Sequence, residues 1–408
     1  MVVLFWVSCA VVAYVYAGYP VLLAVWARLR PRAVARRPET DATGPERPAI
    51  SIVIAARNEG PRLPARIDNL LQLEYPADRR QIIVVSDGST DDTLARLARY
   101  GPAVETVAVP VGGKALALNA GVERARFDLL VFADARQTFA PDALAELAKP
   151  FQDPQVGAVT GELLLDSESA GRRTTTGDRR VRTHPGCGGG GVERRAAADR
   201  RRAIRSTVAD GVGLYWRYEK QLRRLESTVW STLGATGAIY AMRRSLWTPL
   251  PADTLLDDVL APMRCVLAGY RVVFNDRAQA FDRTPPDADT ERRRKIRTLA
   301  GNYQILRLEP QLLLPWRNRV WIQYLSHKIA RLLVPYALLA FMASSIALAE
   351  RAPVYAAALG AQCLFYLLAG YGAWLDRRDA IDVRPETPGF APGWSGARPR
   401  ADRGAVNA

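Results

Sequence analysis

The chain has 408 residues, and 49% of them are hydrophobic, so it can bury the core of one large domain and still carry attached segments. Its formal net charge is +15, but eleven arginines fall within residues 166–205 and no aromatic-rich basic module accompanies them, which argues against nucleic acid as a partner. The four cysteines lack metal-ligand or disulfide spacing, and there are only two histidines, so acid–base chemistry would have to come from carboxylates.

Three uncharged runs are long enough to cross a hydrocarbon core about 30 Å thick. They are residues 2–26, 332–349 and 352–375. The first run lacks the basic start of a cleaved signal peptide, which is the alternative, so we predict an N-terminal anchor. The second contains Pro335, which leaves a buried or re-entrant helix as the alternative to a membrane hairpin.

Basic residues flank all three runs on one side of the predicted membrane. Arginines follow the first run, Lys328 and Arg331 precede the second, and Arg377 and Arg378 follow the third. Lysine and arginine are enriched in cytoplasmic loops next to membrane spans. We therefore predict an integral inner or plasma membrane protein with residues 27–330 and the tail in the cytosol.

Between the first two runs, short apolar stretches alternate with helical patterns. The stretches are SIVIAA (51–56), QIIVVS (81–86), VETVAV (104–109), DLLVFA (128–133) and QVGAVT (155–160). Uninterrupted apolar stretches of this length suit strands buried on both faces of a parallel sheet. This predicts an α/β, Rossmann-like domain with a mostly parallel sheet, whose ligand lies beyond the carboxyl ends of the strands.

Polar residues follow three of these strands, at 56–59, 86–92 and 134–137. Each group alone is explained equally well as a turn or a helix cap. Together they suit a nucleotide diphosphate, which needs hydrogen-bond acceptors for its base and ribose and a divalent cation for its phosphates.

Lys114 lies in GGKALALNAG (112–121), shortly before a predicted helix. The glycine spacing of this segment is not that of a P-loop. A lysine near a helix N-terminus attracts phosphate, and a solvated surface lysine is the alternative interpretation.

The ordered motifs SIVIAARNE, VVSDGSTDDT, GGKALALNAG and FADARQ resemble the nucleotide-binding half of family 2 inverting glycosyltransferases, which have the GT-A fold. The similarity covers roughly residues 50–165 and continues in 213–227, 234–244, 255–274 and 292–304. It implies a cytosolic GT-A domain with one N-terminal and two C-terminal transmembrane helices. It also implies a metal-dependent enzyme that transfers a hexose from a nucleotide-sugar donor.

On this resemblance, the donor-binding residues are Ala56, Asn58, Glu59, Asp87, Lys114, Asn119, Asp134 and Arg136. Asp134 matches the first aspartate of the family's DxD motif, which holds the metal, Mg²⁺ or Mn²⁺, that binds the diphosphate. Arg136 stands where the second aspartate is expected. Either Asp134 binds the metal together with water, or Arg136 neutralises the phosphate charge directly.

The resemblance also implies the catalytic residues. Asp257 and Asp258, in LLDDVLAPMR, match the family's acidic pair, and we predict that Asp258 is the general base and that Asp257 sets its pKa. Helix capping is the alternative, for Asp257 or for both aspartates. Arg294 and Arg297 lie where relatives have QxxRW, and would stabilise the departing diphosphate. A basic helix at the lipid surface is the alternative for this segment.

The acceptor side is implied to include Trp216 and Gly237, although core packing is the better account of the aromatic residues around Trp216. The acceptor would be lipid-linked or a growing saccharide, held at the membrane lipid. A processive synthase of chitin-like or hyaluronan-like chains is the alternative. Relatives with a complete QxxRW make polymers processively, and the incomplete motif here leans against that alternative. A catalytically inactive scaffold that binds sugar nucleotides is a further one.

We therefore divide the chain into five segments. The predicted boundaries are an anchor at 1–27, a GT-A domain at 48–300 with a disordered insertion at 166–206, amphipathic interface helices at 301–330, a transmembrane hairpin at 331–376 and a disordered tail at 377–408.

Overall fold

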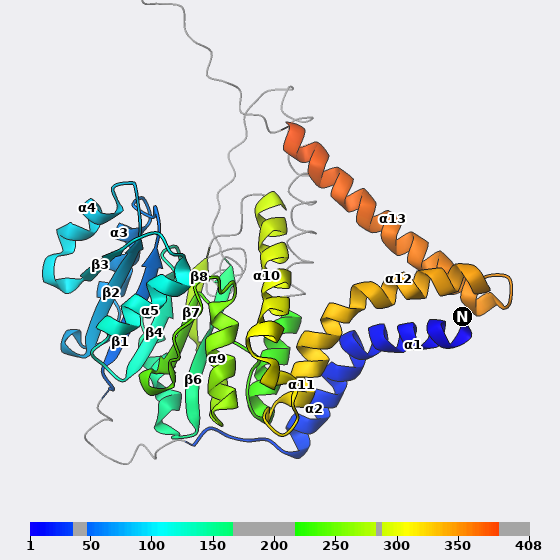
Figure 1. Cartoon of the computed structure of the whole chain (residues 1–408), viewed down its shortest axis with the longest axis horizontal. Helices are drawn as coiled ribbons and strands as arrows, with labels where there is room; N and C mark the ends of the chain where they lie inside the picture. The colour runs from blue at the N-terminus through cyan, green and yellow to red at the C-terminus, as the bar shows by residue number, and fades with distance from the viewer. Residues whose placement is uncertain (36–46, 166–216, 283–287, 383–408) are drawn as a thin grey trace, which may run out of the picture. The chain divides into compact units, whose positions relative to one another are not determined.

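The computed structural model describes residues 1–35, 47–165, 217–282 and 288–382. The chain divides into two compact units, Met1–Phe341 and Met342–Ala408. The first unit contains a mixed eight-stranded sheet (Figure 1). The predicted insertion at 166–206 and Trp216 lie outside the described residues.

The sheet has the strand order β3-β2-β1-β4-β7-β6-β8-β5. Strands β1, β2, β3 and β4 are parallel neighbours, and β6 is parallel to β8, whereas β7 and β5 run antiparallel to their partners. All five predicted strands are confirmed. The strands are β1 Ile50–Ala56, β2 Arg80–Asp87, β3 Glu105–Val109, β4 Leu129–Ala133, β5 Thr138–Phe139, β6 Val156–Leu165, β7 Ile239–Arg243 and β8 Arg271–Asp282.

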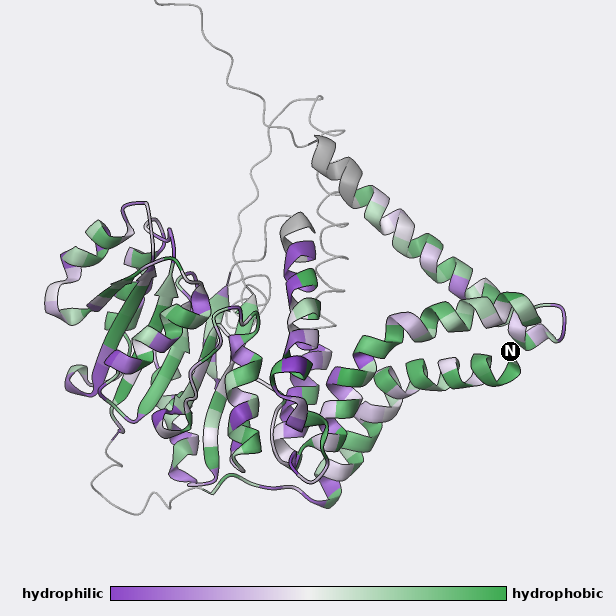
Figure 2. Cartoon of the chain, in the orientation of Figure 1, coloured by the Kyte–Doolittle hydropathy of each residue, from purple (hydrophilic) through white to green (hydrophobic). Residues whose placement is uncertain are grey.

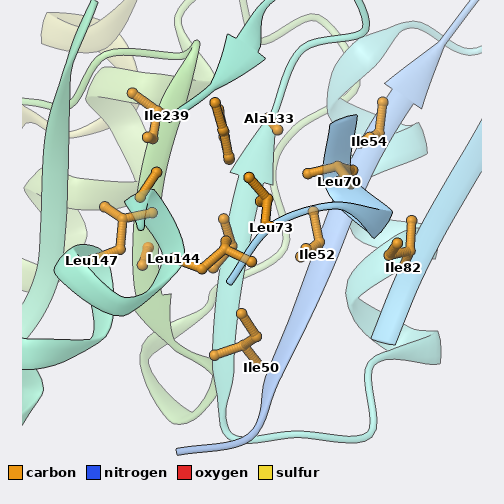
Figure 3. Close-up of a cluster of buried hydrophobic side chains, with 14 of the residues drawn as sticks. Ile50, Ile52, Ile54, Leu70, Leu73, Ile82, Ala133, Leu144, Leu147 and Ile239 are labelled. Carbon is orange, nitrogen blue, oxygen red and sulfur yellow. The ribbon is translucent and has the colours of Figure 1, made fainter. Parts of the chain in front are cut away.

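Helices cover both faces of the sheet and create two apolar cores. Ile50, Ile52 and Ile54 of β1 pack with α3 (Leu63–Leu71) and α6 (Ala143–Ala148) in one core, part of which Figure 3 shows. Val53 points to the other core, with α5 (Lys114–Arg124) and α9 (Asp257–Leu267). Burial on both faces explains why these strands read as uninterrupted apolar stretches.

The remaining helical segments of the described residues are mostly short. They are α1 Val2–Ala13, η1 Tyr14–Gly18, α2 Tyr19–Leu29, η2 Ala77–Arg79, α4 Thr93–Leu97, η3 Ala98–Ala103, η4 Lys149–Gln152, a helix at 217–229, η5 Arg244–Leu246, α10 Ala288–Leu308, η6 Pro310–Leu313, α11 Trp321–Gln323, η7 Tyr324–Ile329, α12 Ala330–Leu348 and α13 Pro353–Asp382.

Three helical stretches are long and apolar enough to cross a membrane, one near the N-terminus and two near the C-terminus, as predicted (Figure 2). They are Val2–Leu29, Trp321–Leu348 and Pro353–Leu375. The N-terminal stretch contacts the second one within the first unit, because Tyr14 Oη lies 2.7 Å from Ser326 Oγ and the Phe5 and Phe341 rings are 4.9 Å apart.

The structure differs from two of the predicted segment boundaries. The second apolar stretch begins at Trp321 rather than 332, and Leu312, Val320 and Tyr324 of the predicted interface segment are buried in the core with α9. Their apolar side chains therefore pack against the domain itself, while Trp316 remains 76% exposed. At the other end, α13 continues to Asp382, beyond the predicted start of the tail, and residues 383–408 lie outside the described part.

Candidate functional site

A cavity of about 360 Å³ opens where β1 and β4 end. We call it the β1–β4 cavity. Its lining brings together six of the predicted site residues from four separate parts of the chain, and adds three more. The lining residues are Ala55, Glu59, Lys114, Asp134, Ala135, Arg136, Arg293, Arg294 and Arg297.

The loop after β1 is held in place by Asn58. Its backbone φ of 54° is left-handed, a conformation in which asparagine is enriched. The Asn58 N–H donates to Ser89 Oγ at 3.1 Å, and Asn58 Oδ1 accepts from the Thr90 N–H at 2.8 Å. These bonds tie the β1 loop to the β2 loop, and Glu59 follows at the rim of the β1–β4 cavity.

Asp87, at the end of β2, supports the segment before α5. Its side chain is buried and accepts the N–H groups of Gly112 at 2.7 Å and Gly113 at 3.0 Å. Gly113 has a φ of 88°, which favours glycine, and α5 begins at the next residue. In this arrangement Asp87 fixes the position of Lys114.

Lys114 joins two acidic groups at the edge of the cavity. Its ammonium lies 3.2 Å from Asp134 Oδ1 and 3.2 Å from Asp257 Oδ2. Burial lowers the pKa of Lys114, but the carboxylates of Asp257, Asp134 and Asp258 outweigh it and raise that pKa above its ordinary value. Lys114 is therefore a charged link between β4 and α9, which excludes the alternative of a freely solvated lysine.

Asp257 and Asp258 form the first turn of α9, where the helix dipole favours carboxylates. The residue before the helix is Leu256, and neither aspartate side chain caps it, so the capping alternative is wrong. Asp258 Oδ2 accepts the Gly237 N–H at 3.0 Å, and a Cβ on Gly237 would lie 3.0 Å from that same oxygen. A glycine is therefore favoured at position 237.

Asp258 has the protonation behaviour of a base that works near neutral pH. Burial and the neighbouring charge of Asp257 raise its pKa to about 6, while the cations Lys114 and Lys328 oppose the rise. A group with this pKa is largely ionised at pH 7 and is still basic enough to accept a proton.

The remaining lining residues make the cavity strongly basic. Arg293, Arg294 and Arg297 come from α10, where a spacing of three or four residues places side chains on one face. Arg136 also lines the cavity, and its Nε lies 3.1 Å from Asp282 Oδ2 at the end of β8. Such a concentration of guanidinium groups suits a phosphate-bearing ligand.

Four predicted donor-binding residues do not line the cavity: Asn58 and Asp87, which hold the neighbouring loops, and Asn119 and Ala56. The Asn119 side chain holds the backbone of Leu250 with two hydrogen bonds of 2.9 Å. Its Nδ2 donates to the Leu250 carbonyl, and its Oδ1 accepts the Leu250 N–H. Ala56 points into the core beside α3, and its neighbour Ala55 faces the cavity instead. The Asn119 and Ala56 side chains thus contact the backbone and the core beside the site, and not the cavity itself.

Replacing Asn119 with Ala is expected to lower the free energy of unfolding by about 1–3 kcal/mol, because the backbone groups of Leu250 lose their partners. The affinity for a nucleotide ligand should stay within about twofold, since Asn119 is absent from the cavity lining. Thermal unfolding and nucleotide titration measure the two effects. A weakened affinity at unchanged stability would restore Asn119 to the binding residues.

Arg293, Ala55, Ala135 and Asp282 were not predicted as site residues from the sequence. Arg293 belongs to the same arginine run as Arg294, so the run itself was its signal. Asp282 gave no local signal, since it meets Arg136 only through the pairing of β8 with β5 and β6.

Residues 51–244 match the family model described as Glycosyl transferase family 2. The poly-beta-1,6-N-acetyl-D-glucosamine synthase of Staphylococcus aureus (strain COL) is 30% identical over 125 residues, which are 30% of this chain and 30% of that protein. The N-acetylglucosaminyltransferase of Rhizobium sp. (strain N33) is 33% identical over 128 residues, covering 30% and 28%. The aligned region thus spans less than a third of these curated relatives.

The fold is similar to that of a solved structure, the mannosyltransferase PcManGT from Pyrobaculum calidifontis in complex with GDP-Man and Mn²⁺. The TM-score is 0.61 at 22% identity, and the superposition covers 91% of this chain and 94% of that one. The strand order, the basic cavity and the family match agree with one another. Residues 51–244 therefore form a glycosyl transferase family 2 domain within a GT-A fold, in a chain that also has three helices apolar enough to span a membrane.

Proposed function

We propose that this chain is a membrane-bound inverting glycosyltransferase that moves a sugar from a nucleotide-sugar donor to a lipid-linked or growing saccharide acceptor. The observation that carries the proposal is the position of Asp258. It follows Asp257, which pairs with the cavity-lining Lys114, and its pKa is raised to about 6.

In the proposed reaction, Asp258 accepts the proton of the acceptor hydroxyl, and the oxygen of that hydroxyl attacks the anomeric carbon of the donor sugar. The bond between that carbon and the diphosphate oxygen breaks, and the electron pair leaves with the nucleotide. Attack from the face opposite the leaving group inverts the configuration. Arg294 and Arg297 stabilise the negative charge that develops on the diphosphate.

The donor is proposed to occupy the β1–β4 cavity. Glu59 and the backbone after β1 contact the nucleoside, and Arg136 and the α10 arginines lie close to its phosphates. Asn58 and Asp87 are proposed to act indirectly, because they hold the loops that carry Glu59 and Lys114 and do not contact the donor themselves.

We also propose that the donor is bound with Mg²⁺ or Mn²⁺, and Asp134 is the residue that fits this role. Its carboxylate is 32% exposed at the cavity, and carboxylate oxygen is the ligand type that these ions prefer. The cation, when bound, neutralises part of the diphosphate charge. Within the described residues no group of three His, Cys, Asp or Glu side chains is arranged to hold a metal, so further ligands would come from the donor phosphates.

The domain is proposed to face the cytosol, where nucleotide sugars are made, with the three apolar helices anchoring it in the inner or plasma membrane. The support is the basic sequence that flanks each apolar run on one side. Labelling of single cysteines introduced at Arg30 and Arg351 in intact cells tests this. Reagent that does not cross the membrane should reach only position 351.

A raised Asp258 pKa has a direct consequence for the pH profile. The base must be ionised, so kcat/KM should be level above about pH 6 and fall about tenfold per pH unit below it. Lys114→Met removes a positive charge that lowers the Asp258 pKa, so the acid limb should move to higher pH. If the acid limb of this variant stayed at the wild-type pH, the charge of Lys114 would have no effect on the pKa of the base.

A second candidate is a processive polysaccharide synthase. It is favoured by the similarity of a 125-residue segment to a poly-beta-1,6-N-acetyl-D-glucosamine synthase. Size analysis of the radiolabelled product distinguishes the two, because a processive enzyme yields long chains at low turnover and a single-addition enzyme yields one extended acceptor.

The proposed function is tested with membranes that contain the full chain and a panel of UDP-, GDP- and dTDP-sugars, with Mg²⁺, Mn²⁺ or a chelator. We expect nucleotide release from one donor class, strongest with a divalent cation. Nucleotide binding without release in any lipid extract would favour an inactive sugar-nucleotide-binding scaffold instead.

A further inference from the structure

A positive charge of the chain itself lies between two carboxylates at the edge of the β1–β4 cavity. The Lys114 ammonium is 3.2 Å from Asp134 Oδ1, just after β4, and 3.2 Å from Asp257 Oδ2, at the start of α9. The two oxygens are therefore at most twice that distance apart, although they come from distant parts of the chain. Carboxylates that converge on one point in this way are typical ligands of a divalent cation.

Asp257 depends on this positive charge more than Asp134 does. Its side chain is only 9% exposed, compared with 32% for Asp134. Asp257 Oδ2 is buried, and no group in the described part of the chain donates a hydrogen bond to it. A buried carboxylate oxygen without a hydrogen bond is costly unless a cation stays beside it. If the ammonium moves away, another cation therefore has to take its place.

Lys114 is able to leave this position, because only its side chain would have to move. Its backbone is fixed at the start of α5 by the hydrogen bonds that Asp87 accepts from the two preceding glycines. The Lys114 side chain is a flexible four-carbon stem that is 39% exposed and lines the β1–β4 cavity. The diphosphate that we place in this cavity offers the ammonium other anionic partners. A bound donor would therefore compete with the two carboxylates for Lys114.

The other cations around Asp134 are engaged elsewhere. Arg136, which stands where the DxD motif has its second aspartate, pairs with Asp282 at 3.1 Å. Arg66 is close enough to act electrostatically on Asp134, but within the described residues it forms no ion pair with it, and its guanidinium lies 3.9 Å from the centre of the Phe139 ring. Neither arginine would neutralise Asp134 in place of Lys114.

We propose that Asp134 and Asp257 form a site for one divalent cation, which the Lys114 ammonium fills as long as no donor is bound. When the diphosphate draws Lys114 away, both carboxylates become free to hold Mg²⁺ or Mn²⁺. Asp257 then supplies the carboxylate that Arg136 replaces in the motif. Cation binding would therefore depend on the donor. The proposal rests on the proposed function, because it names a second ligand for the cation proposed there and the residue that keeps its site closed.

Binding of Mn²⁺ to the full chain in detergent micelles, without any nucleotide, tests this apart from catalysis. The electron paramagnetic resonance signal of free Mn²⁺ gives the dissociation constant. We expect Lys114→Met to bind Mn²⁺ at least about tenfold more tightly than the wild type, because the change removes a competing positive charge. Asp257→Asn in the Lys114→Met background should lose that gain, since one carboxylate remains.

Lys149→Met is the matched control, because it removes the cation beside a single buried carboxylate, that of Glu146, outside the cavity lining. Its affinity for Mn²⁺ should equal that of the wild type. Equal affinity in the wild type and Lys114→Met would overturn the proposal. So would a gain of the same size in Lys149→Met, or a gain that the double variant keeps.

A second measurement uses a variant that keeps Lys114. Mn²⁺ should raise the affinity of the wild type for a nucleoside diphosphate, and Asp257→Asn should lose most of this enhancement while it still binds the nucleotide in the presence of a chelator. Chelation of Mn²⁺ by the nucleotide in solution is the same for both proteins, so a difference comes from the chain. An enhancement as large as that of the wild type would exclude Asp257 as a ligand.

Sugar transfer separates these results from the proposed function. If the variants bind Mn²⁺ as expected but the wild type releases no nucleotide from any donor, the proposed function is contradicted and the cation site stands. If the wild type transfers sugar and Lys114→Met binds Mn²⁺ no more tightly, the function stands and the cation site is wrong.

Discussion

Asp258→Asn is expected to lower the rate of sugar transfer by about 10²–10⁴-fold, the usual contribution of a general base. Asparagine has nearly the same shape, and its side-chain oxygen can still accept the Gly237 N–H. The amide cannot take up the proton of the acceptor hydroxyl, however. Initial rates of nucleotide release measure the loss, and equilibrium titration of the nucleotide should give an affinity close to that of the wild type.

The matched control is Asp253→Asn, which makes the same chemical change in the exposed segment that leads to α9. Asp253 contacts Gln304 and is absent from the cavity lining, so its variant should retain the wild-type rate. If Asp258→Asn kept more than a tenth of the activity, another group would have to be the base. If it lost nucleotide binding instead, its effect would be on the shape of the site.

The central part of the sheet was predictable because its strands are buried on both faces. In β1, Ile52 and Val53 enter different cores, so both must be apolar and the stretch is uninterrupted. In β8 the pattern is mixed. Asn275, Asp276 and Arg277 interrupt its apolar positions where its pairing with β6 shifts register. No two-residue period survives such a shift, and the strand was not predicted.

The convergence of Glu59, Lys114 and Asp134 was also predictable. Each follows or faces the end of a central strand, and parallel neighbours bring their carboxyl ends to one edge of the sheet. Asn119 was assigned to the site through its motif alone. Five residues along a helix rotate a side chain by about 140°, so Asn119 and Lys114 lie on different faces of α5.

Contacts between distant parts of the chain could not be predicted in the same way. The Arg136–Asp282 pair joins residues 146 positions apart, and Arg223 reaches Thr236 only because the helix at 217–229 packs beside the β7 loop. Nothing in the local sequence of either residue marks its partner. The sequence also left a basic helix at the lipid surface as the alternative for residues 292–304, whereas three arginines of this segment line the cavity.

Arg297→Gln is expected to lower turnover by about 10²–10³-fold, because it removes a charged donor that stabilises the leaving diphosphate. Arg297→Lys should recover part of the loss, since it keeps the charge but not the planar pair of donors. Single-turnover rates with a saturating donor measure the chemical step apart from binding. The rate constant should fall more than the donor affinity, as charge on the diphosphate increases in the transition state.

Arg307→Gln provides the control, because Arg307 lies on the same helix, is exposed and is absent from the cavity lining. An interfacial helix that bound only anionic lipid would respond differently. Arg297→Gln and Arg307→Gln would then weaken membrane association to a similar extent, and activity in anionic vesicles would recover as more protein was added. A loss specific to Arg297 that persists at saturating donor and in neutral lipid requires that its guanidinium act on the reacting phosphates.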